Sequence, residues 1–350
     1  MEYALEHQLD NTGIGMSGQK FRVGAIAFLS LIATLTALEF SVRMALPAYN
    51  PALHLRFERA HGNMPPLGVR NSVHRLIKNS GDYDVTVRFN RYGLRDSQDL
   101  ANAGPDDYIV VGDSFAFGWG VEENERFSER LRDLTGRRVF NLGISADIDG
   151  YERLLDYAAR LGARVGNVIL SVNLIDDVRN YEPAPKRKAA IAGPDAGGNT
   201  LIKIKLYLLA RSSLYFLMTN MVNRVDWLRK ILIRAGLIVP LENVNSATPG
   251  DREIKSTADR LAALARRFNI TFLIIPSRAL WVGNRGPETD RVHRSLLREL
   301  AKRHLDVIDM RPLMEAGGNP MGYHFLNDGH WRAAGHQLAA EAIARKIGKR

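Results

Sequence analysis

The sequence predicts an α/β protein: a three-layer α/β/α sandwich with a mostly parallel sheet, preceded by an N-terminal transmembrane helix. Short apolar runs of strand length alternate with longer segments of helical period, which is typical of a parallel sheet covered on both faces. One such run, Tyr108–Val111, continues into Gly112-Asp113-Ser114 and then into a helical pattern. This places a serine at the carboxyl end of a strand, where open α/β sheets have their ligand sites. The third observation is an uncharged apolar run over residues 23–38.

The chain order predicts a cytoplasmic N-terminal tail, a membrane anchor, a stalk and a globular domain that carries a basic helical insert. Their expected bounds are 1–20, 21–43, 44–83 and 84–350, with the insert at 200–240. The expected strands cover residues 84–89, 108–111, 138–143, 167–173, 270–276 and 306–309, and the expected helices cover 123–134, 151–161, 257–268, 290–303 and 333–347.

The apolar run near the N-terminus is slightly shorter than the ~20 residues of a spanning helix, but residues 40–42 extend it beyond Glu39. A buried core helix and a cleaved signal peptide are the alternatives. No small-x-small cleavage site follows the run, which favours an uncleaved anchor. Lys20 and Arg22 before the run predict that the N-terminus stays inside. We therefore expect a single-pass protein of the inner (cell) membrane with a periplasmic, extracytoplasmic domain.

The predicted insert mixes basic and apolar residues. Its charges are too frequent for a membrane span, so we expect one or two amphipathic helices. They either lie on lipid headgroups or over the active site, or pack on the domain with a solvated basic face. Residues 182–200 before the insert are rich in Pro, Gly, Lys and Ala and predict a flexible excursion. The basic residues of the insert are Lys203, Lys205, Arg211, Arg224, Arg229, Lys230 and Arg234.

The composition narrows the functional classes. Of the 350 residues, 45% are hydrophobic, which suits a globular core, and the formal net charge of +10 favours anionic surroundings such as phospholipid or an acidic polymer. No zinc, helix-turn-helix or aromatic-basic pattern indicates nucleic-acid binding. The chain has no cysteine, which excludes a disulfide framework, a zinc–thiolate site, a thiol nucleophile and a lipoprotein anchor. We predict no cofactor and no metal.

A serine hydroxyl needs a base and a group that orients the base. The best candidates lie far along the chain in Asn327-Asp328-Gly329-His330-Trp331. Two residues only two positions apart cannot face each other on a helix or strand, so Asp328 and His330 must lie on a loop. His324 and His336 are nearby competitors, and a metal site formed by Asp328, His330 and His336 lacks a further ligand cluster.

These motifs resemble those of the SGNH/GDSL hydrolase family over about residues 90–347. Gly112-Asp113-Ser114-Phe115 resembles the nucleophile block, and Asn141-Leu-Gly143 resembles the glycine block. Asp328-x-His330-Trp resembles the ending of a bacterial, membrane-anchored branch. The resemblance implies a flavodoxin-like fold, with Ser114 as nucleophile, His330 as general base and Asp328 orienting the imidazole.

The resemblance also implies an oxyanion hole formed by the N–H groups of Ser114 and Gly143 and by an asparagine side chain. Without a gap, that asparagine falls on Asp176, and an ionised aspartate repels an oxyanion. Either Asn173 takes over, or Asp176 is protonated, or the hole has fewer donors. Losing one donor can cost ~10²–10³ in rate.

The implied activity is acyl transfer through an acyl-serine. The first hypothesis is a membrane-anchored serine esterase that acts on O-acylated carbohydrate or lipid. The second is an O-acetyltransferase of exopolysaccharide modification, in which a sugar hydroxyl replaces water as acceptor. The third is a non-catalytic binding module that retains the fold, and its sequence support is the departure at Asp176.

Overall fold

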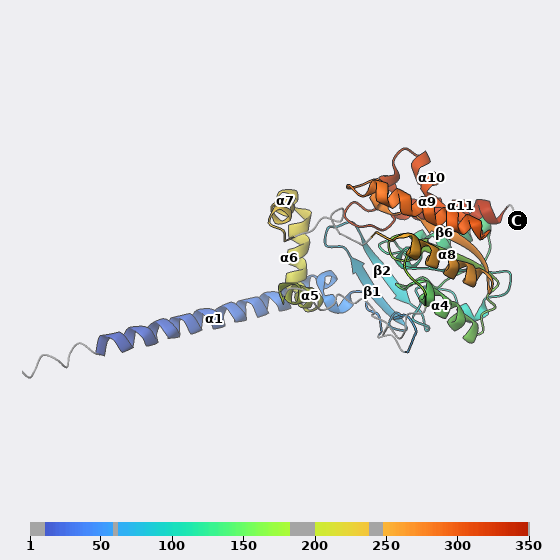
Figure 1. The fold of residues 1–350 in the computed structure, drawn as a ribbon. Helices are drawn as coiled ribbons and strands as arrows, with labels where there is room; N and C mark the ends of the chain where they lie inside the picture. The colour runs from blue at the N-terminus through green and yellow to red at the C-terminus, as the bar shows by residue number, and fades with distance from the viewer. Residues whose placement is uncertain (1–10, 59–61, 183–199, 238–247, 349–350) are drawn as a thin grey trace, which may run out of the picture. The chain divides into compact units, whose positions relative to one another are not determined.

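The computed structural model of the chain describes residues 11–58, 62–182, 200–237 and 248–348. The chain divides into two compact units (Figure 1). The first comprises residues 1–53 and 196–219, and the second comprises residues 54–195 and 220–350. The α/β domain lies in the second unit, and the apolar N-terminal helix lies in the first.

The sheet of the α/β domain has five parallel strands. They are β3 (Tyr108–Val111), β4 (Val139–Asn141), β5 (Asn167–Asn173), β6 (Asn269–Ile275) and β7 (Val307–Asp309), in the spatial order β4-β3-β5-β6-β7. This is the flavodoxin-like order, in which the chain changes direction across the sheet at its first strand. That strand is β3, so the switch point of the topology carries Gly112-Asp113-Ser114. The predicted core strands are confirmed.

Two apolar clusters cover the two faces of the sheet, which confirms the three-layer sandwich. On β3, Ile109 and Val111 face one cluster, while Tyr108 and Val110 face the other. The first cluster includes α4 (Ile148–Arg160), α8 (Asp251–Ala265) and α9 (Gly286–Lys302). The second includes α2 (Ser114–Phe117), α3 (Phe127–Thr135), α10 (Met310–Ala316) and α11 (Ala333–Ile347). Strand residues alternate between the clusters because successive side chains point to opposite faces.

An antiparallel hairpin precedes the sheet and corrects the predicted stalk over 44–83. Strand β1 (Ser72–Ile77) pairs with β2 (Asp84–Phe89), from Ser72 opposite Phe89 to Ile77 opposite Asp84. The second unit therefore begins at His54 rather than near residue 84. The sequence did not reveal β1, because its apolar residues do not alternate. Leu76 is the one buried residue among the six of this strand.

The first unit contains α1 (Asn11–Ala45), which begins inside the predicted tail over 1–20. Within it, Lys20–Ala45 is long and apolar enough to cross a membrane, and its 18-residue window has a mean hydropathy of 2.0. The insert forms three helices instead of one or two: α5 (Thr200–Arg211), α6 (Ser213–Arg224) and α7 (Asp226–Arg234). The predicted excursion over 182–200 lies almost wholly outside the described residues.

A carboxylate of α1 explains the break between α5 and α6. Glu39 Oε2 accepts hydrogen bonds from Ser212 Oγ at 2.8 Å and Leu214 N at 2.9 Å, and Oε1 accepts one from Ser213 N at 2.8 Å. Glu39 thus caps the first turn of α6, whose N–H groups have no partner within the helix. Arg43 donates to the carbonyl of Arg211, the last residue of α5, at 2.6 Å.

Candidate active site

The serine lies on a sharp turn between β3 and α2. An added Cβ at Gly112 would lie 1.8 Å from Ser171 Oγ of β5, so only glycine fits between the two strands. Asp113 then caps α2, because its Oδ1 accepts a hydrogen bond from Phe115 N at 3.0 Å. Ser114 is the first residue of this helix and keeps a partly exposed position.

The structure brings Ser114, His330 and Asp328 together. His330 Nε2 lies 2.8 Å from Ser114 Oγ, and His330 Nδ1 is hydrogen-bonded to Asp328 Oδ1. Asp328 also accepts a bond from His330 N at 3.1 Å, so the carboxylate fixes both the ring and the backbone of the histidine. Asp328 and His330 lie between η7 (Pro320–Tyr323) and α11, outside any helix or strand, as predicted from their spacing. The three side chains therefore form the chain of hydrogen bonds that a serine nucleophile, a general base and an orienting acid would need.

The loop of residues 325–331, which we call the histidine loop, is held from several sides. Arg278 is the first residue of η6 (Arg278–Leu280), which follows β6. It donates to the carbonyl groups of Phe325 at 2.9 Å, Asp328 at 3.0 Å and Leu326 at 3.0 Å. Trp119 stacks on the His330 ring with 5.8 Å between centroids and an angle of 26°. These contacts fix the imidazole without help from regular secondary structure.

The two competing histidines are packing residues. Burial lowers the pKa of His324 to about 4, while the carbonyl of Pro320, 3.2 Å from its Nδ1, acts in the opposite direction. Burial also lowers the pKa of His336 to about 3, and its ring stacks on Phe127 at 5.9 Å. Both rings are therefore neutral near pH 7, and neither contacts Ser114 in the described part of the chain.

Two of the three predicted oxyanion donors already have internal acceptors. Gly143 N donates to Asn141 Oδ1 at 2.7 Å. Asn173 Nδ2 donates to Asp113 Oδ2 at 2.8 Å and to Asp176 Oδ2 at 3.2 Å. Among the described residues, no acceptor is bonded to the third donor, the Ser114 N–H. An oxyanion at Ser114 therefore meets one open donor, and it competes with side-chain oxygens for the other two.

A buried polar network below Ser114 explains the position of Asn173. Asn173 N donates to Asp177 Oδ2 at 2.8 Å, and Tyr151 OH donates to Asp177 Oδ1 at 3.0 Å. Burial raises the pKa of Asp177 well above its ordinary value, and burial also raises the pKa of Asp113. The network joins α4 and the end of β5 to the turn before Ser114, so it stiffens the nucleophile.

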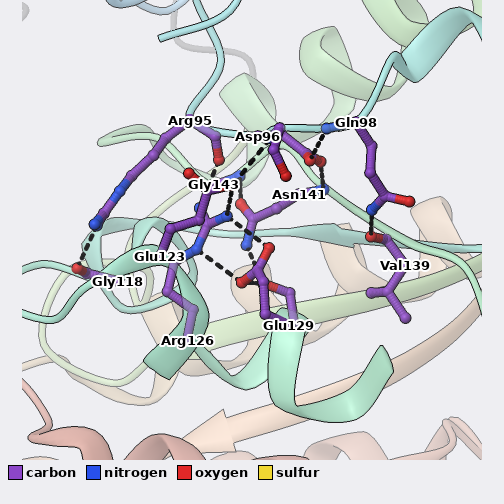
Figure 2. A network of polar contacts seen from close by, with 12 residues as sticks. Arg95, Asp96, Gln98, Gly118, Glu123, Arg126, Glu129, Val139, Asn141 and Gly143 are labelled. Carbon is purple, nitrogen blue, oxygen red and sulfur yellow. Dashed lines mark hydrogen bonds and ion pairs between the residues drawn. The ribbon is translucent and has the colours of Figure 1, made fainter. Parts of the chain in front are cut away.

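A second network supports the glycine block (Figure 2). Asp96 Oδ2 accepts a bond from Asn141 N at 2.6 Å, and Asn141 Nδ2 donates to the carbonyl of Ala116 at 2.9 Å. Arg95 donates to the carbonyl of Gly118 at 2.7 Å, immediately after α2. The sequence did not predict a role in the site for Arg95 and Asp96. Their place within residues 90–347, which resemble the SGNH/GDSL hydrolase family, was the available signal.

The same region contains the only group of acidic residues, within the described part of the chain, that is compact enough to hold a cation: Asp96, Glu123 and Glu129. Arg126 already occupies it. The guanidinium is fully buried and bonds to Glu129 Oε1 at 2.7 Å and Oε2 at 2.9 Å, and it lies 3.8 Å from Glu123. The cluster is therefore an internal ion pair network.

The fold and site define a class of protein: an α/β protein with a Ser-His-Asp arrangement of the kind that serine-based acyl transfer requires. Residues 239–350 match the family model described as the SGNH hydrolase-like domain of acetyltransferase AlgX. No curated protein matches the chain.

Solved structures similar to the chain include the lipase/acylhydrolase from Enterococcus faecalis, at 11% identity and a TM-score of 0.39, covering 70% of this chain and 96% of that one. A member of the lipolytic protein G-D-S-L family from Veillonella parvula DSM 2008 has 13% identity and a TM-score of 0.39, covering 70% and 98%. The acetyl xylan esterase AlAXEase has 12% identity and a TM-score of 0.38, covering 69% and 99%.

Residues 239–350 therefore match an SGNH hydrolase-like family model, and the motif blocks and the five-stranded parallel sheet are similar to those of the SGNH/GDSL hydrolase family. The match to the family model supports an acyl-ester hydrolase or acyltransferase activity.

Proposed function

We propose that the protein is a membrane-anchored serine esterase that acts on O-acylated carbohydrate or lipid. The observation that carries the proposal is the line of hydrogen bonds from Ser114 Oγ through His330 to Asp328. Ser114 Oγ attacks the ester carbonyl, and its proton moves to His330 Nε2. Asp328 stabilises the imidazolium, while the Ser114 N–H receives the developing oxyanion.

Collapse of the tetrahedral intermediate breaks the ester bond, and His330 returns the proton to the leaving alcohol. The acyl group remains on Ser114 Oγ. His330 then removes a proton from the acceptor, which attacks the acyl-serine and releases Ser114. Water as acceptor gives a carboxylic acid, and a sugar hydroxyl gives a new ester.

O-acetyl transfer to an exopolysaccharide is the second candidate, because the matching family model is that of a domain of an acetyltransferase. The same triad serves both reactions. The two candidates differ in where the acyl group goes, so product analysis with and without a sugar acceptor separates them. An acetylated sugar that forms faster than acetate would favour the transferase.

Membrane attachment is part of the proposal. Lys20–Ala45 has 26 residues and, as a helix, a length of about 39 Å, which exceeds the ~30 Å hydrocarbon core. Its apolar side chains are exposed, among them Phe28 and Phe40. Lys20 and Arg22 at its start favour an internal N-terminus and an extracytoplasmic catalytic domain.

The insert also belongs at the membrane surface in this proposal. Glu39 and Arg43, at the far end of the apolar helix, hold the joint between α5 and α6. Trp227, Ile231 and Leu237 are exposed, and Asp226 is the one acidic residue of residues 200–240. Exposed apolar side chains among basic ones suit an interface with anionic lipid.

Single cysteines test the lipid contact, since the natural chain has none. The full chain in anionic nanodiscs carries a fluorescent label at Trp227→Cys or Ile231→Cys, with Leu134→Cys of α3 as the exposed control. We expect a lipid-borne quencher to act on the two insert positions but not on the control. Equal quenching at all three positions would contradict the lipid contact.

The esterase activity is tested with p-nitrophenyl acetate and the full chain in detergent. We expect Ser114→Ala to abolish hydrolysis and labelling by a fluorophosphonate, while Ser295→Ala on α9 leaves both unchanged. A folded wild-type chain that neither hydrolyses the ester nor becomes labelled would overturn the proposal and favour the non-catalytic binding module. Labelling without hydrolysis would favour the transferase.

A further inference from the structure

The turn of the hairpin, residues 78–83, contacts the acid of the triad. Lys78 Nζ donates to Asp328 Oδ2 at 2.6 Å, and Tyr83 OH donates to the same oxygen at 3.2 Å. The Tyr83 hydroxyl in turn accepts a bond from Trp119 Nε1 at 2.8 Å. Lys78 and Tyr83 lie within residues 44–83, for which the sequence predicts a stalk.

The two oxygens of Asp328 have separate partners. Oδ1 accepts bonds from the ring and the backbone of His330, and Oδ2 accepts bonds from Lys78 and Tyr83. The Asp328 side chain is only 7% exposed, so these contacts replace the hydration of its carboxylate. Burial alone would raise the pKa of Asp328, but His330 and Lys78 together hold it below its ordinary range.

Packing fixes the turn against the histidine loop. The Tyr83 ring lies 5.0 Å from the Phe325 ring at 60°. Gly120 has a φ of 87°, and an added Cβ there would lie 2.7 Å from both Tyr83 Cδ1 and Phe325 Cε2. Asp82 Oδ1 accepts a bond from Asn327 N at 3.2 Å. The hairpin therefore meets the loop through a packed interface and not through a single ion pair.

We propose that Lys78 and Tyr83 are positioning residues of the triad, supplied by the hairpin that precedes the α/β domain. Together they fix the rotation of the Asp328 carboxylate, so that Oδ1 faces His330 Nδ1. The Lys78 ammonium also offsets part of the negative charge that Asp328 presents to the imidazole. This inference rests on the proposed function, because it assigns the hairpin a role in the chemistry of Ser114 and His330.

The charge effect has a defined sign. The groups that face Asp328 are Lys78 and Tyr83 of the hairpin, His330 of its own loop and Arg278, which bonds to the Asp328 carbonyl. Removing the Lys78 charge leaves the carboxylate less compensated, so the imidazole holds its proton more tightly. Because a general base must be unprotonated, the acidic limb of the kcat/KM profile then moves to higher pH.

The experiment compares pH profiles of p-nitrophenyl acetate hydrolysis by the full chain and its Lys78→Met, Lys78→Arg and Tyr83→Phe variants. We expect Lys78→Met to lower kcat about tenfold or more and to shift the acidic limb upward by about 0.5–1 pH unit, because the 33% exposed ammonium is partly screened. Lys78→Arg should keep the limb in place, and Tyr83→Phe should lower kcat without moving it.

The matched control is Arg88→Met, which removes one positive charge from an exposed position of the same hairpin. Suppose that the wild-type chain shows Ser114-dependent hydrolysis and that the acidic limb lies at the same pH in Lys78→Met and Arg88→Met. This result would overturn the inference about Lys78 and leave the proposed function standing. Wild-type protein without Ser114-dependent hydrolysis would overturn the proposed function and this inference with it. If Lys78→Met fails to fold, the profiles of Lys78→Arg and Tyr83→Phe decide whether the hairpin positions Asp328. A kcat of Tyr83→Phe equal to that of the wild type would refute the positioning role.

Discussion

The turn before Ser114 depends on the absence of a side chain at Gly112, and Gly112→Ala tests this directly. The added Cβ would lie 1.8 Å from Ser171 Oγ, 3.0 Å from Ala116 Cβ and 3.1 Å from Ser171 Cβ. The first distance is about half of a normal van der Waals contact. Ser171 is fully buried in the central strand β5, so it cannot swing into solvent.

The expected cost follows from this geometry. Overpacking a core by one methyl group usually costs about 1–3 kcal/mol, and a contact this short belongs at the upper end, at about 3 kcal/mol. Ser171→Ala removes the clashing oxygen, which has no hydrogen-bond partner in the described part of the chain, so alone it should change the unfolding free energy by less than about 1 kcal/mol. The double variant keeps only the contacts near 3.0 Å and should recover about 2 kcal/mol.

The assay is thermal unfolding of the full chain in detergent, combined with the rate at which a fluorophosphonate labels Ser114. A loss of about 3 kcal/mol corresponds to a fall in Tm of about 5–10 °C. We expect Gly112→Ala to lose both stability and labelling, Ser171→Ala to keep both, and the double variant to regain most of the stability. If Gly112→Ala unfolds at the wild-type temperature, or if the two substitutions are simply additive, the explanation of this turn is wrong.

Two further predictions concern carboxyl groups near the site. Asp176→Asn removes an acceptor of the Asn173 amide and places a donor at the family position. We therefore expect kcat to rise about tenfold or more, up to the ~10²–10³ that one oxyanion donor can contribute. Asp176→Ala separates the loss of charge from the gain of a donor, and an unchanged kcat in both variants would contradict the argument. Burial raises the pKa of Asp96 to about 7, so its stabilising contribution is complete below the ordinary value of about 4 and is lost as the pH rises through about 7. We therefore expect the free energy of unfolding in urea to fall for the wild type, relative to Asp96→Asn, between about pH 4.5 and 8. A difference between the two proteins that does not vary with pH would refute this prediction.

The sequence was sufficient for the parts of the fold in which burial is periodic. Strand β5, Asn167–Asn173, has six buried residues in succession, and α11 has an apolar face that repeats every third or fourth residue. The position of Ser114 at the carboxyl end of a predicted strand also indicated the site. Its partners Asp328 and His330 were indicated by the resemblance of their motif to the SGNH/GDSL hydrolase family.

The sequence was insufficient where a side chain meets a partner far along the chain. Lys78 contacts Asp328 across 250 positions, and nothing local to Lys78 distinguishes it from a solvated lysine. Asn173 looked like a free oxyanion donor, yet Asp113 and Asp176 both accept from its amide. In the sequence, Glu39 interrupts an apolar run without apparent reason. In the structure, its carboxylate accepts a hydrogen bond from Ser213 N at the start of α6. Each role depends on geometry that no periodicity encodes.

The distribution of charge bears on one inference drawn from composition. The formal net charge of +10 suggested anionic surroundings such as phospholipid or an acidic polymer, and seven basic residues and one acidic residue lie in residues 200–240, so most of that charge belongs to the insert. Around Ser114 the contacts involve carboxyl groups instead: Asp113 precedes it, Asp176 shares the Asn173 amide with Asp113, and Asp328 orients His330. A negatively charged acyl group would be repelled there, whereas an uncharged one such as acetyl would not. The positive charge thus favours the lipid surface, and the site favours a neutral acyl ester.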